Sequence, residues 1–159
     1  MSRRILDFIQ EPRGDVLRRL LLAAGDRAAR VVLVIRDDAD LNEGGRNLLA
    51  SMEADLLQRD RGASWPGTTL LKEKATILNF VATEAVVKTL ATSGVGLYAW
   101  QQPELPEDPG FVRSDGSPIL ATIAHENDAY LEVDDEELAH LIERVPELAH
   151  ITRLHDDET

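Results

Sequence analysis

One group of neighbouring side chains has the residue types that metal binding or acid-base chemistry requires. His125, Glu126 and Asp128 lie within four residues of one another, and an imidazole beside carboxylates can hold a divalent cation. Adjacent strand residues point to opposite faces, however, and Ala129 stands where a helical His-Glu-x-x-His zinc pattern needs its second histidine. The spacing therefore favours a turn whose side chains bind nearby backbone. We predict no catalytic residue, metal or cofactor, and a small enzyme or ligand-binding protein that uses these three residues is the alternative.

Other catalytic motifs are missing from the sequence. No serine lies in a G-x-S-x-G elbow, and the chain has no G-x-x-x-x-G-K-[ST] loop and no G-x-G-x-x-G fingerprint. The chain has no cysteine, which excludes a thiolate nucleophile, a thiolate metal site and a disulfide framework. These absences disfavour covalent hydrolases, nucleotide hydrolases and dinucleotide-dependent enzymes.

Acidic residues dominate the last third of the chain. The 159 residues include 17 Lys+Arg and 29 Asp+Glu, for a formal charge of −12. Residues 1–100 have a net charge of +1, whereas residues 101–159 have a net charge of −13. Such a chain repels phosphates, so we expect no nucleic-acid partner. A basic protein is the electrostatically favoured partner, although the charge could also serve only to keep a small protein soluble.

A proline-rich segment, residues 101–109, holds three candidate contact residues. We expect an extended surface connection, because the residue before a proline avoids helical conformation. Such a loop would present Glu104, Glu107 and Asp108 to a partner. Glu107 or Asp108 is also expected to pair with Arg113. The alternative is a segment that only connects two strands.

Aromatic side chains beside this segment complete the predicted contact surface. Tyr98 and Trp100 lie next to a loop in a chain with only 4% aromatic residues, and such side chains can anchor an interface. Covering the rim of a core is the commoner role for Trp65 and Trp100. Glu126 and Asp128 add carboxylates from a later turn. The predicted partner-binding residues are Tyr98, Trp100, Glu104, Glu107, Asp108, Glu126 and Asp128.

The elements that must position these residues follow no regular strand-helix alternation. Hydrophobic spacing and capping residues predict helices over 12–25, 41–58, 83–93 and 134–145. Apolar and β-branched runs predict strands over 30–36, 68–71, 75–81, 95–100, 111–113, 119–124, 129–133 and 149–154, with 5–9 as a strand or a helical turn and 59–67 as a loop. This order predicts one α+β domain over residues 1–155, with a mainly antiparallel sheet, a C-terminal meander and helices packed against it. Residues 156–159 are expected to be an acidic disordered tail.

Several short motifs resemble a group of small uncharacterised bacterial proteins. They cover about residues 65–133 and include Trp65-Pro66-Gly67-Thr68, Leu105-Pro106-Glu107-Asp108, Asp115-Gly116 and Ile123-Ala124-His125-Glu126. Pro109 departs from the series, which would have leucine there. The resemblance implies no activity and no catalytic residues. In size, acidity and lack of motifs the chain also resembles immunity proteins of bacterial toxin systems.

These observations predict a cytoplasmic, non-enzymatic protein-binding module. Its sharper form is an immunity- or antitoxin-like protein that neutralises a basic partner through its acidic C-terminal face. The longest apolar runs, 20–24 and 31–35, are far shorter than the ~18 residues of a membrane helix, so we expect no membrane partner. A structural subunit or homodimer is a further alternative.

Overall fold

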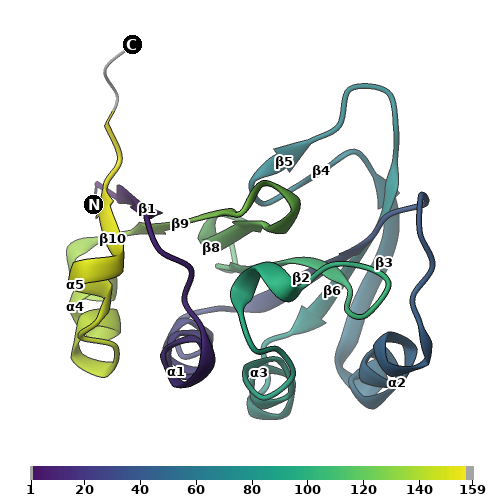
Figure 1. Cartoon of the computed structure of the whole chain (residues 1–159), viewed down its shortest axis with the longest axis horizontal. Helices are drawn as coiled ribbons and strands as arrows, with labels where there is room; N and C mark the ends of the chain where they lie inside the picture. The colour runs from purple at the N-terminus through teal and green to yellow at the C-terminus, as the bar shows by residue number, and fades with distance from the viewer. Residues whose placement is uncertain (1, 157–159) are drawn as a thin grey trace.

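The structure is a computed structural model that describes residues 2–156, and Figure 1 shows a long sheet with helices along one face. The helices are α1 (Gly14–Gly25), α2 (Glu43–Ser51), α3 (Glu84–Ala91), α4 (Asp135–Arg144) and α5 (Leu148–Ile151), with short 3-10 helices η1 (Glu53–Asp55), η2 (Leu97–Ala99) and η3 (Ala124–Glu126). The strands are β1 (Arg4–Phe8), β2 (Arg30–Ile35), β3 (Leu56–Gly62), β4 (Ser64–Trp65), β5 (Thr68–Thr69), β6 (Ala75–Val81), β7 (Glu107–Val112), β8 (Pro118–Ile123), β9 (Asp128–Val133) and β10 (Thr152–Leu154).

Eight strands of the described chain form one sheet in the order β10-β1-β9-β8-β7-β2-β6-β3, and every neighbouring pair is antiparallel. Strands β7, β8 and β9 are neighbours in space as they are in sequence, so the α+β class with a C-terminal meander is confirmed. Strand β1 lies between β9 and β10, far from β2. Among residues 2–156, none of the helices combines the length and the apolar character that crossing a bilayer requires.

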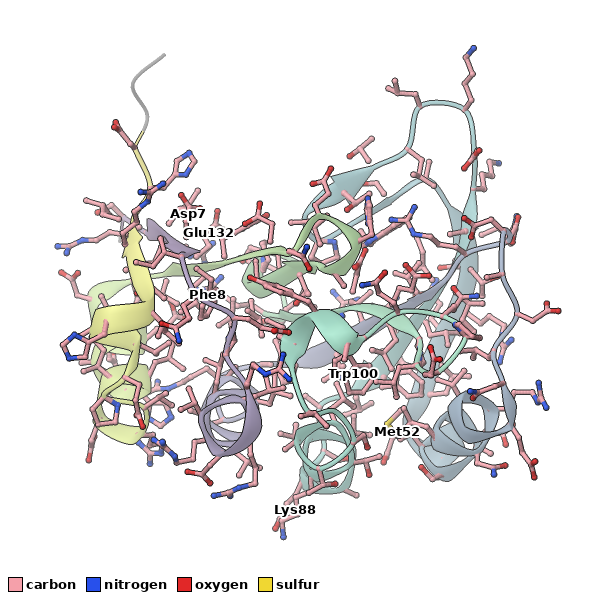
Figure 2. All side chains as sticks on the ribbon, in the orientation of Figure 1. Asp7, Phe8, Met52, Lys88, Trp100 and Glu132 are labelled. Atoms are coloured by element: carbon pink, nitrogen blue, oxygen red, sulfur yellow. The ribbon has the colours of Figure 1, made fainter. Side chains whose placement is uncertain are left out.

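The main core lies between the sheet and the helices. Figure 2 shows Met52 and Trp100 in this layer, and it shows Asp7 and Glu132 on the opposite side of the sheet. Helix α1 contributes a stripe of buried side chains at helical spacing, which are Leu17, Leu20, Leu21 and Ala24. Asp7 and Glu132 therefore mark the sheet face that the helices leave uncovered.

Strand β2 is apolar on both sides because both sides are covered. Val31 and Leu33 pack in the core under the helices, whereas Val32 and Val34 pack with Trp65 in a second, smaller cluster on the other face. The β4–β5 hairpin, which contains Trp65, covers that part of the face (Figure 1). A strand buried on both sides needs no polar alternation, which explains the apolar run.

Two glycines let this hairpin lie close to the sheet. A Cβ atom on Gly110 of β7 would lie 3.1 Å from Cγ of Pro66, and a Cβ on Gly67 would lie 3.0 Å from Cδ1 of Ile123. Gly67 also has a φ of 89°, which other residues rarely adopt. The Trp65-Pro66-Gly67 turn therefore contacts strands β7 and β8 directly.

The local capping and turn signals of the sequence are confirmed. Thr83 caps α3, since its hydroxyl accepts a hydrogen bond from the amide of Val86 at 3.2 Å. Asp134 and Glu137 form the predicted capping box at the start of α4. The predicted Asp-Gly hairpin joins β7 to β8, with Gly116 at a φ of 88°.

The predicted helix over 41–58 is wrong in its second half. Helix α2 ends at Ser51, and residues from Leu56 to Gly62 form strand β3, which pairs with β6 at the edge of the sheet. The predicted loop 59–67 is therefore mostly strand. Because β3 is polar and exposed along most of its length, its sequence lacks the alternation that marks a half-buried strand.

Three further boundaries differ from the predictions. The predicted strand 95–100 contains η2 instead, and the predicted strand 149–154 divides into α5 and β10. The predicted connection 101–109 ends early, because β7 begins at Glu107. Of the predicted tail 156–159, residues 157–159 lie outside the described residues.

Candidate functional site

The seven predicted contact residues separate into a buried set and an exposed set. Trp100 and Asp108 have no exposed surface, and Glu107 is 7% exposed. The expectation that Trp100, Glu107 and Asp108 are presented to a partner is therefore wrong, because the side chains lie inside the fold. The residues that reach the surface are Tyr98, which is half-buried, and Glu104, Glu126 and Asp128, which are exposed.

Asp108 holds two buried donors with one carboxylate. Its Oδ2 accepts a hydrogen bond from the indole Nε1 of Trp65 at 3.0 Å, and its Oδ1 accepts from the amide of Ala124 at 2.9 Å. The backbone of Asp108 has a φ of 55°, a left-handed conformation that aspartate tolerates better than most residues. Asp108 therefore ties the β4–β5 hairpin and the end of β8 to the start of β7.

Arg36, directly after β2, forms a largely buried cluster with Glu107, Asp108 and Trp65 and is its cation. Its Nε lies 3.2 Å from Oε1 of Glu107, and its Nη2 lies 3.7 Å from Oδ2 of Asp108. The guanidinium carbon is 5.2 Å from the centre of the Trp65 ring, within the range of a cation–π contact. The predicted pairing of Glu107 or Asp108 with Arg113 is wrong, because Arg36 occupies that place.

Gln102 fixes the backbone that supports Arg36. Its Oε1 accepts from the amide of Arg36 at 2.6 Å, and its Nε2 donates to the carbonyl oxygen of Arg36 at 3.1 Å and to that of Ala39. A side-chain amide that uses both ends in this way holds the turn after β2 in one conformation. The cluster is therefore a rigid structural unit rather than an adjustable surface loop.

Burial controls the charge of Glu107. Loss of solvent raises the pKa of the Glu107 carboxyl, and this effect outweighs the opposing attraction of Arg36. Because the folded pKa lies above the unfolded one, the group stabilises the fold most at low pH. That stabilisation is lost as the pH rises through the folded pKa.

The variant Glu107→Gln should remove this pH dependence. Glutamine keeps an oxygen near Arg36 but cannot ionise. The unfolding free energy of the variant, relative to that of the wild type, should therefore increase as the pH rises from about 4 to 8. Urea unfolding at several pH values measures this difference. A difference that stays constant, or that grows toward low pH, would contradict the expected effect.

The structure does not bring His125, Glu126 and Asp128 together. Nδ1 of His125 lies 3.5 Å from Nη2 of Arg36, whereas Oδ1 of Asp128 accepts from the amide of Ala129 at 2.9 Å. The part of the chain that is described contains no group of three or more His, Asp or Glu side chains able to hold a metal ion. The three residues therefore form no metal-binding group in the described part of the chain.

Arginines of the first 36 residues pair with part of the acidic last third. Within residues 2–156 six such ion pairs are present, and most of them are exposed, so that each contributes little by itself. They are Arg3–Asp115, Arg4–Asp135, Arg19–Glu147, Arg27–Glu136, Arg36–Glu107 and Arg36–Asp108. The charge asymmetry of the sequence is therefore partly offset in the folded protein.

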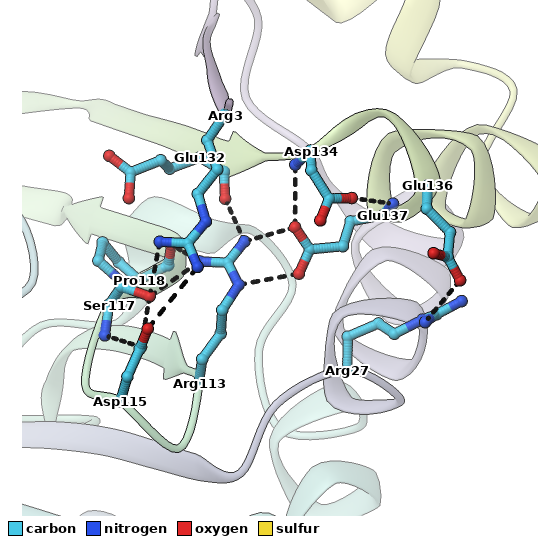
Figure 3. A network of polar contacts seen from close by, with 10 residues as sticks. All are labelled: Arg3, Arg27, Arg113, Asp115, Ser117, Pro118, Glu132, Asp134, Glu136 and Glu137. Atoms are coloured by element: carbon cyan, nitrogen blue, oxygen red, sulfur yellow. Dashed lines mark hydrogen bonds and ion pairs between the residues drawn. The ribbon is translucent and has the colours of Figure 1, made fainter. Parts of the chain in front are cut away.

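Arg113 and Glu137 form the best-satisfied of the ion pairs (Figure 3). Arg113 donates to both carboxylate oxygens of Glu137 at 2.7 and 2.8 Å, and both side chains are only 12% exposed. Its other donors reach the carbonyl oxygens of Pro118 at 2.8 Å and Glu132 at 2.7 Å and the hydroxyl of Ser117 at 3.3 Å. All five N–H groups of Arg113 are thereby used, which fastens the β7–β8 turn to β9 and α4.

A second group of carboxylates lies in β9 and in the preceding η3. Glu126, Asp128 and Glu132 form no ion pair with any Lys, Arg or His of residues 2–156. Asp128 and Glu132 point to the same face of β9 as Tyr130, because strand residues alternate. This face is the one that the helices leave uncovered (Figure 2).

Tyr98 of η2 packs against the main core and lies within electrostatic range of Asp128. Gln101 donates from Nε2 to the carbonyl oxygens of Tyr98 and Ala124, which ties η2 to η3. Burial, together with the charges of Asp128 and Glu11, raises the pKa of Tyr98 to about 12. We name the five residues Tyr98, Glu126, Asp128, Tyr130 and Glu132 the acidic patch.

The acidic patch keeps only part of the predicted contact surface. Tyr98, Glu126 and Asp128 were expected, whereas Tyr130 and Glu132 were missed although both lie on a predicted strand. Burial and the charges of Glu132 and Asp128 raise the pKa of Tyr130, so its hydroxyl stays protonated at neutral pH. Tyr130 and Glu132 alternate with buried residues along β9 in step with Asp128, and this spacing is the sequence signal that identifies them.

Comparisons with protein-family models, with curated proteins and with solved structures find no match. The resemblance of the short motifs stays a prediction. Three of the motif residues, Trp65, Asp108 and His125, nevertheless meet around Arg36. The motifs therefore have a shared structural role in this chain.

Proposed function

We propose that the protein is a non-enzymatic binding module for a basic protein and that the acidic patch is its contact surface. The supporting observation is the contrast between the carboxylates. Of the sixteen acidic residues of the last third, eight are paired with arginines within residues 2–156, whereas Glu126, Asp128 and Glu132 are not. Accessible carboxylates without a counter-charge attract a positive surface and increase the rate of encounter.

The two tyrosines suit such an interface. Tyr98 and Tyr130 are half-buried, so their rings are already held in place while part of each remains accessible. Rigid aromatic side chains provide contact area at a low cost in conformational entropy. Glu104 is exposed, and its backbone carbonyl oxygen lies near Gly45 of α2. It remains a separate candidate contact residue outside the acidic patch.

The sharper form of this proposal is an immunity- or antitoxin-like protein of the cytoplasm that neutralises a basic effector. The acidity and small size of the chain support it. A homodimer that uses the same face is the alternative, and light scattering of the purified protein distinguishes a monomer from a dimer.

Charge reversal tests the contact surface. The triple variant Glu126→Lys, Asp128→Lys and Glu132→Lys should associate with a basic partner at least about tenfold more slowly, and the wild type should lose association as salt increases. The control carries the same charge change at exposed, unpaired positions elsewhere, as Glu43→Lys, Glu53→Lys and Glu73→Lys. Wild type, variant and control serve as baits in an extract of the source organism at low and high salt.

The expected result is a protein that the wild type and the control retain at low salt and that the triple variant does not. Binding rates of that protein, once purified, give the size of the effect. Retention of the same proteins by all three baits would refute the contact surface, and no retained protein at either salt would refute the proposed function.

A further inference from the structure

A hollow of about 460 Å³ opens on the sheet face opposite the helices, beside the β4–β5 hairpin. Its polar side chains include Arg30 of β2, Asn79 of β6 and Tyr130 of β9. Its size falls within the range of small-ligand sites, which is roughly 300–1,000 Å³. Its apolar walls come from both the sheet and the hairpin and include Val32, Ile77, Val112, Trp65, Pro66 and Pro118.

Arg30 lies in this hollow with most of its hydrogen-bonding capacity unused. Its guanidinium makes one long hydrogen bond, from Nη1 to Oδ1 of Asn79 at 3.4 Å. No carboxylate of residues 2–156 forms an ion pair with it. Arg113 shows the contrast, since all five of its donors are satisfied.

The position of Arg30 is unusual in this chain. The molecule has 29 acidic and 17 basic residues, and many of its other arginines pair with a carboxylate. Arg30 begins a strand that has neighbours on both sides, opposite Val81 of β6 and Val112 of β7. It faces the same side as Val32, so its charge is directed into the hollow.

The chemistry of the hollow selects a particular ligand class. The planar guanidinium matches a carboxylate, which it can bind through two parallel hydrogen bonds. The apolar side chains in the lining can accommodate a hydrocarbon body next to that carboxylate. Asp128 and Glu132, which flank Tyr130 on β9, would repel a ligand with several negative charges. A single carboxylate is therefore favoured over a polyphosphate.

We propose that this hollow is a binding site for a monocarboxylate with an apolar body, held by Arg30. Asn79 and the hydroxyl of Tyr130 offer further hydrogen bonds to the bound oxygens. The carboxylate can belong to a small molecule or to the end of a polypeptide, because both present the same group. Tyr130 borders both the hollow and the acidic patch, but this site does not depend on the proposed function.

Nuclear magnetic resonance can test the site with the wild-type protein alone. The chain has two tryptophans. Trp65 lines the hollow, whereas Trp100 is fully buried under the helices, so its indole signal is an internal reference. Hexanoate and benzoate are titrated in parallel with hexanamide and benzamide, which have the same shape but no charge.

The expected result is a saturable shift of the Trp65 indole signal with the acids and at least a tenfold weaker effect with the amides. A second pair of probes, short peptides that end in leucine as the free acid or the amide, distinguishes a chain end from a small molecule. Absence of saturable binding by any acid up to about 10 mM, or equal binding of acids and amides, would overturn the proposal.

A matched pair of variants then locates the binding. Arg30→Gln should lower the affinity for the acids at least tenfold, whereas Arg59→Gln, at an exposed residue of β3, should leave this affinity unchanged. Thermal unfolding confirms that both variants are folded. Equal affinity of Arg30→Gln and the wild type would overturn the assignment of Arg30, and the acidic-patch variants provide a separate test of the proposed function.

Discussion

Asp108→Ala is expected to destabilise the protein by about 3–5 kcal/mol, the range found when one partner of a buried charged network is removed. The indole Nε1 of Trp65 and the amide of Ala124 would both lose their acceptor in a buried site. Each buried donor left without a partner costs roughly 1–3 kcal/mol. Alanine would also have to keep a φ of 55°, which its Cβ disfavours, and Arg36 would lose one of its two carboxylates.

Urea unfolding at neutral pH measures this loss. Asp108→Asn is the informative intermediate, because asparagine tolerates the left-handed conformation and keeps one side-chain acceptor. It should lose less stability than the alanine variant. Asp60→Ala, at an exposed position of β3, is the control and should change stability by less than about 0.5 kcal/mol. An alanine variant at position 108 within 1 kcal/mol of the wild type would contradict this account.

Arg113→Met should cost about 3 kcal/mol at neutral pH, because it leaves the largely buried Glu137 carboxylate without its counter-charge. The carbonyl oxygens of Pro118 and Glu132 would also lose their donor. Burial acts to raise the pKa of Glu137, but the hydrogen bonds from Arg113 and from the amide of Asp134 outweigh it, so the pKa is lowered. The native pair therefore stabilises the fold above the unfolded pKa of Glu137, and this stabilisation is lost as the pH falls through the folded pKa.

The pH dependence makes the Arg113 test specific. The difference in unfolding free energy between wild type and Arg113→Met should shrink as acid protonates Glu137. The double variant Arg113→Met, Glu137→Leu should recover part of the loss at neutral pH, since it removes the isolated charge. Arg18→Met, which breaks an exposed pair with Asp15, is the control and should cost less than about 1 kcal/mol. A constant difference from neutral to acidic pH would contradict the role of this ion pair.

The parts of the fold that local chemistry determines were predictable. The β2 run, the caps at Thr83 and Asp134 and the Asp-Gly turn each depend on residues close in sequence, and the structure confirms them. Strand β3 was not predictable in the same way. Its residues form a strand because β6 offers an edge to pair with, and that edge is created by distant parts of the chain.

The candidate site shows the same division. Trp65, Asp108 and His125 each stand out in the sequence, but nothing local shows that they meet around Arg36. The charge asymmetry is visible in the composition, whereas its pairing across the molecule depends on the fold. The orientation of Arg30 does follow from the sequence, because period-two alternation from Arg30 through Val32 places Arg30 on the face opposite the main core.

The position of β1 between β9 and β10 has a consequence for biosynthesis. The first strand of the described chain has both of its sheet neighbours within residues 128–154, so the nascent chain cannot complete this side of the sheet until those residues have been made. The ion pairs of Arg4, Arg19 and Arg27 must wait for the same residues. Pairing over such separations carries a high loop-closure cost, which slows folding. Strand β1 is therefore expected to join the sheet only after β9 and β10 have been synthesised, and a chain truncated before β9 should leave β1 without a partner.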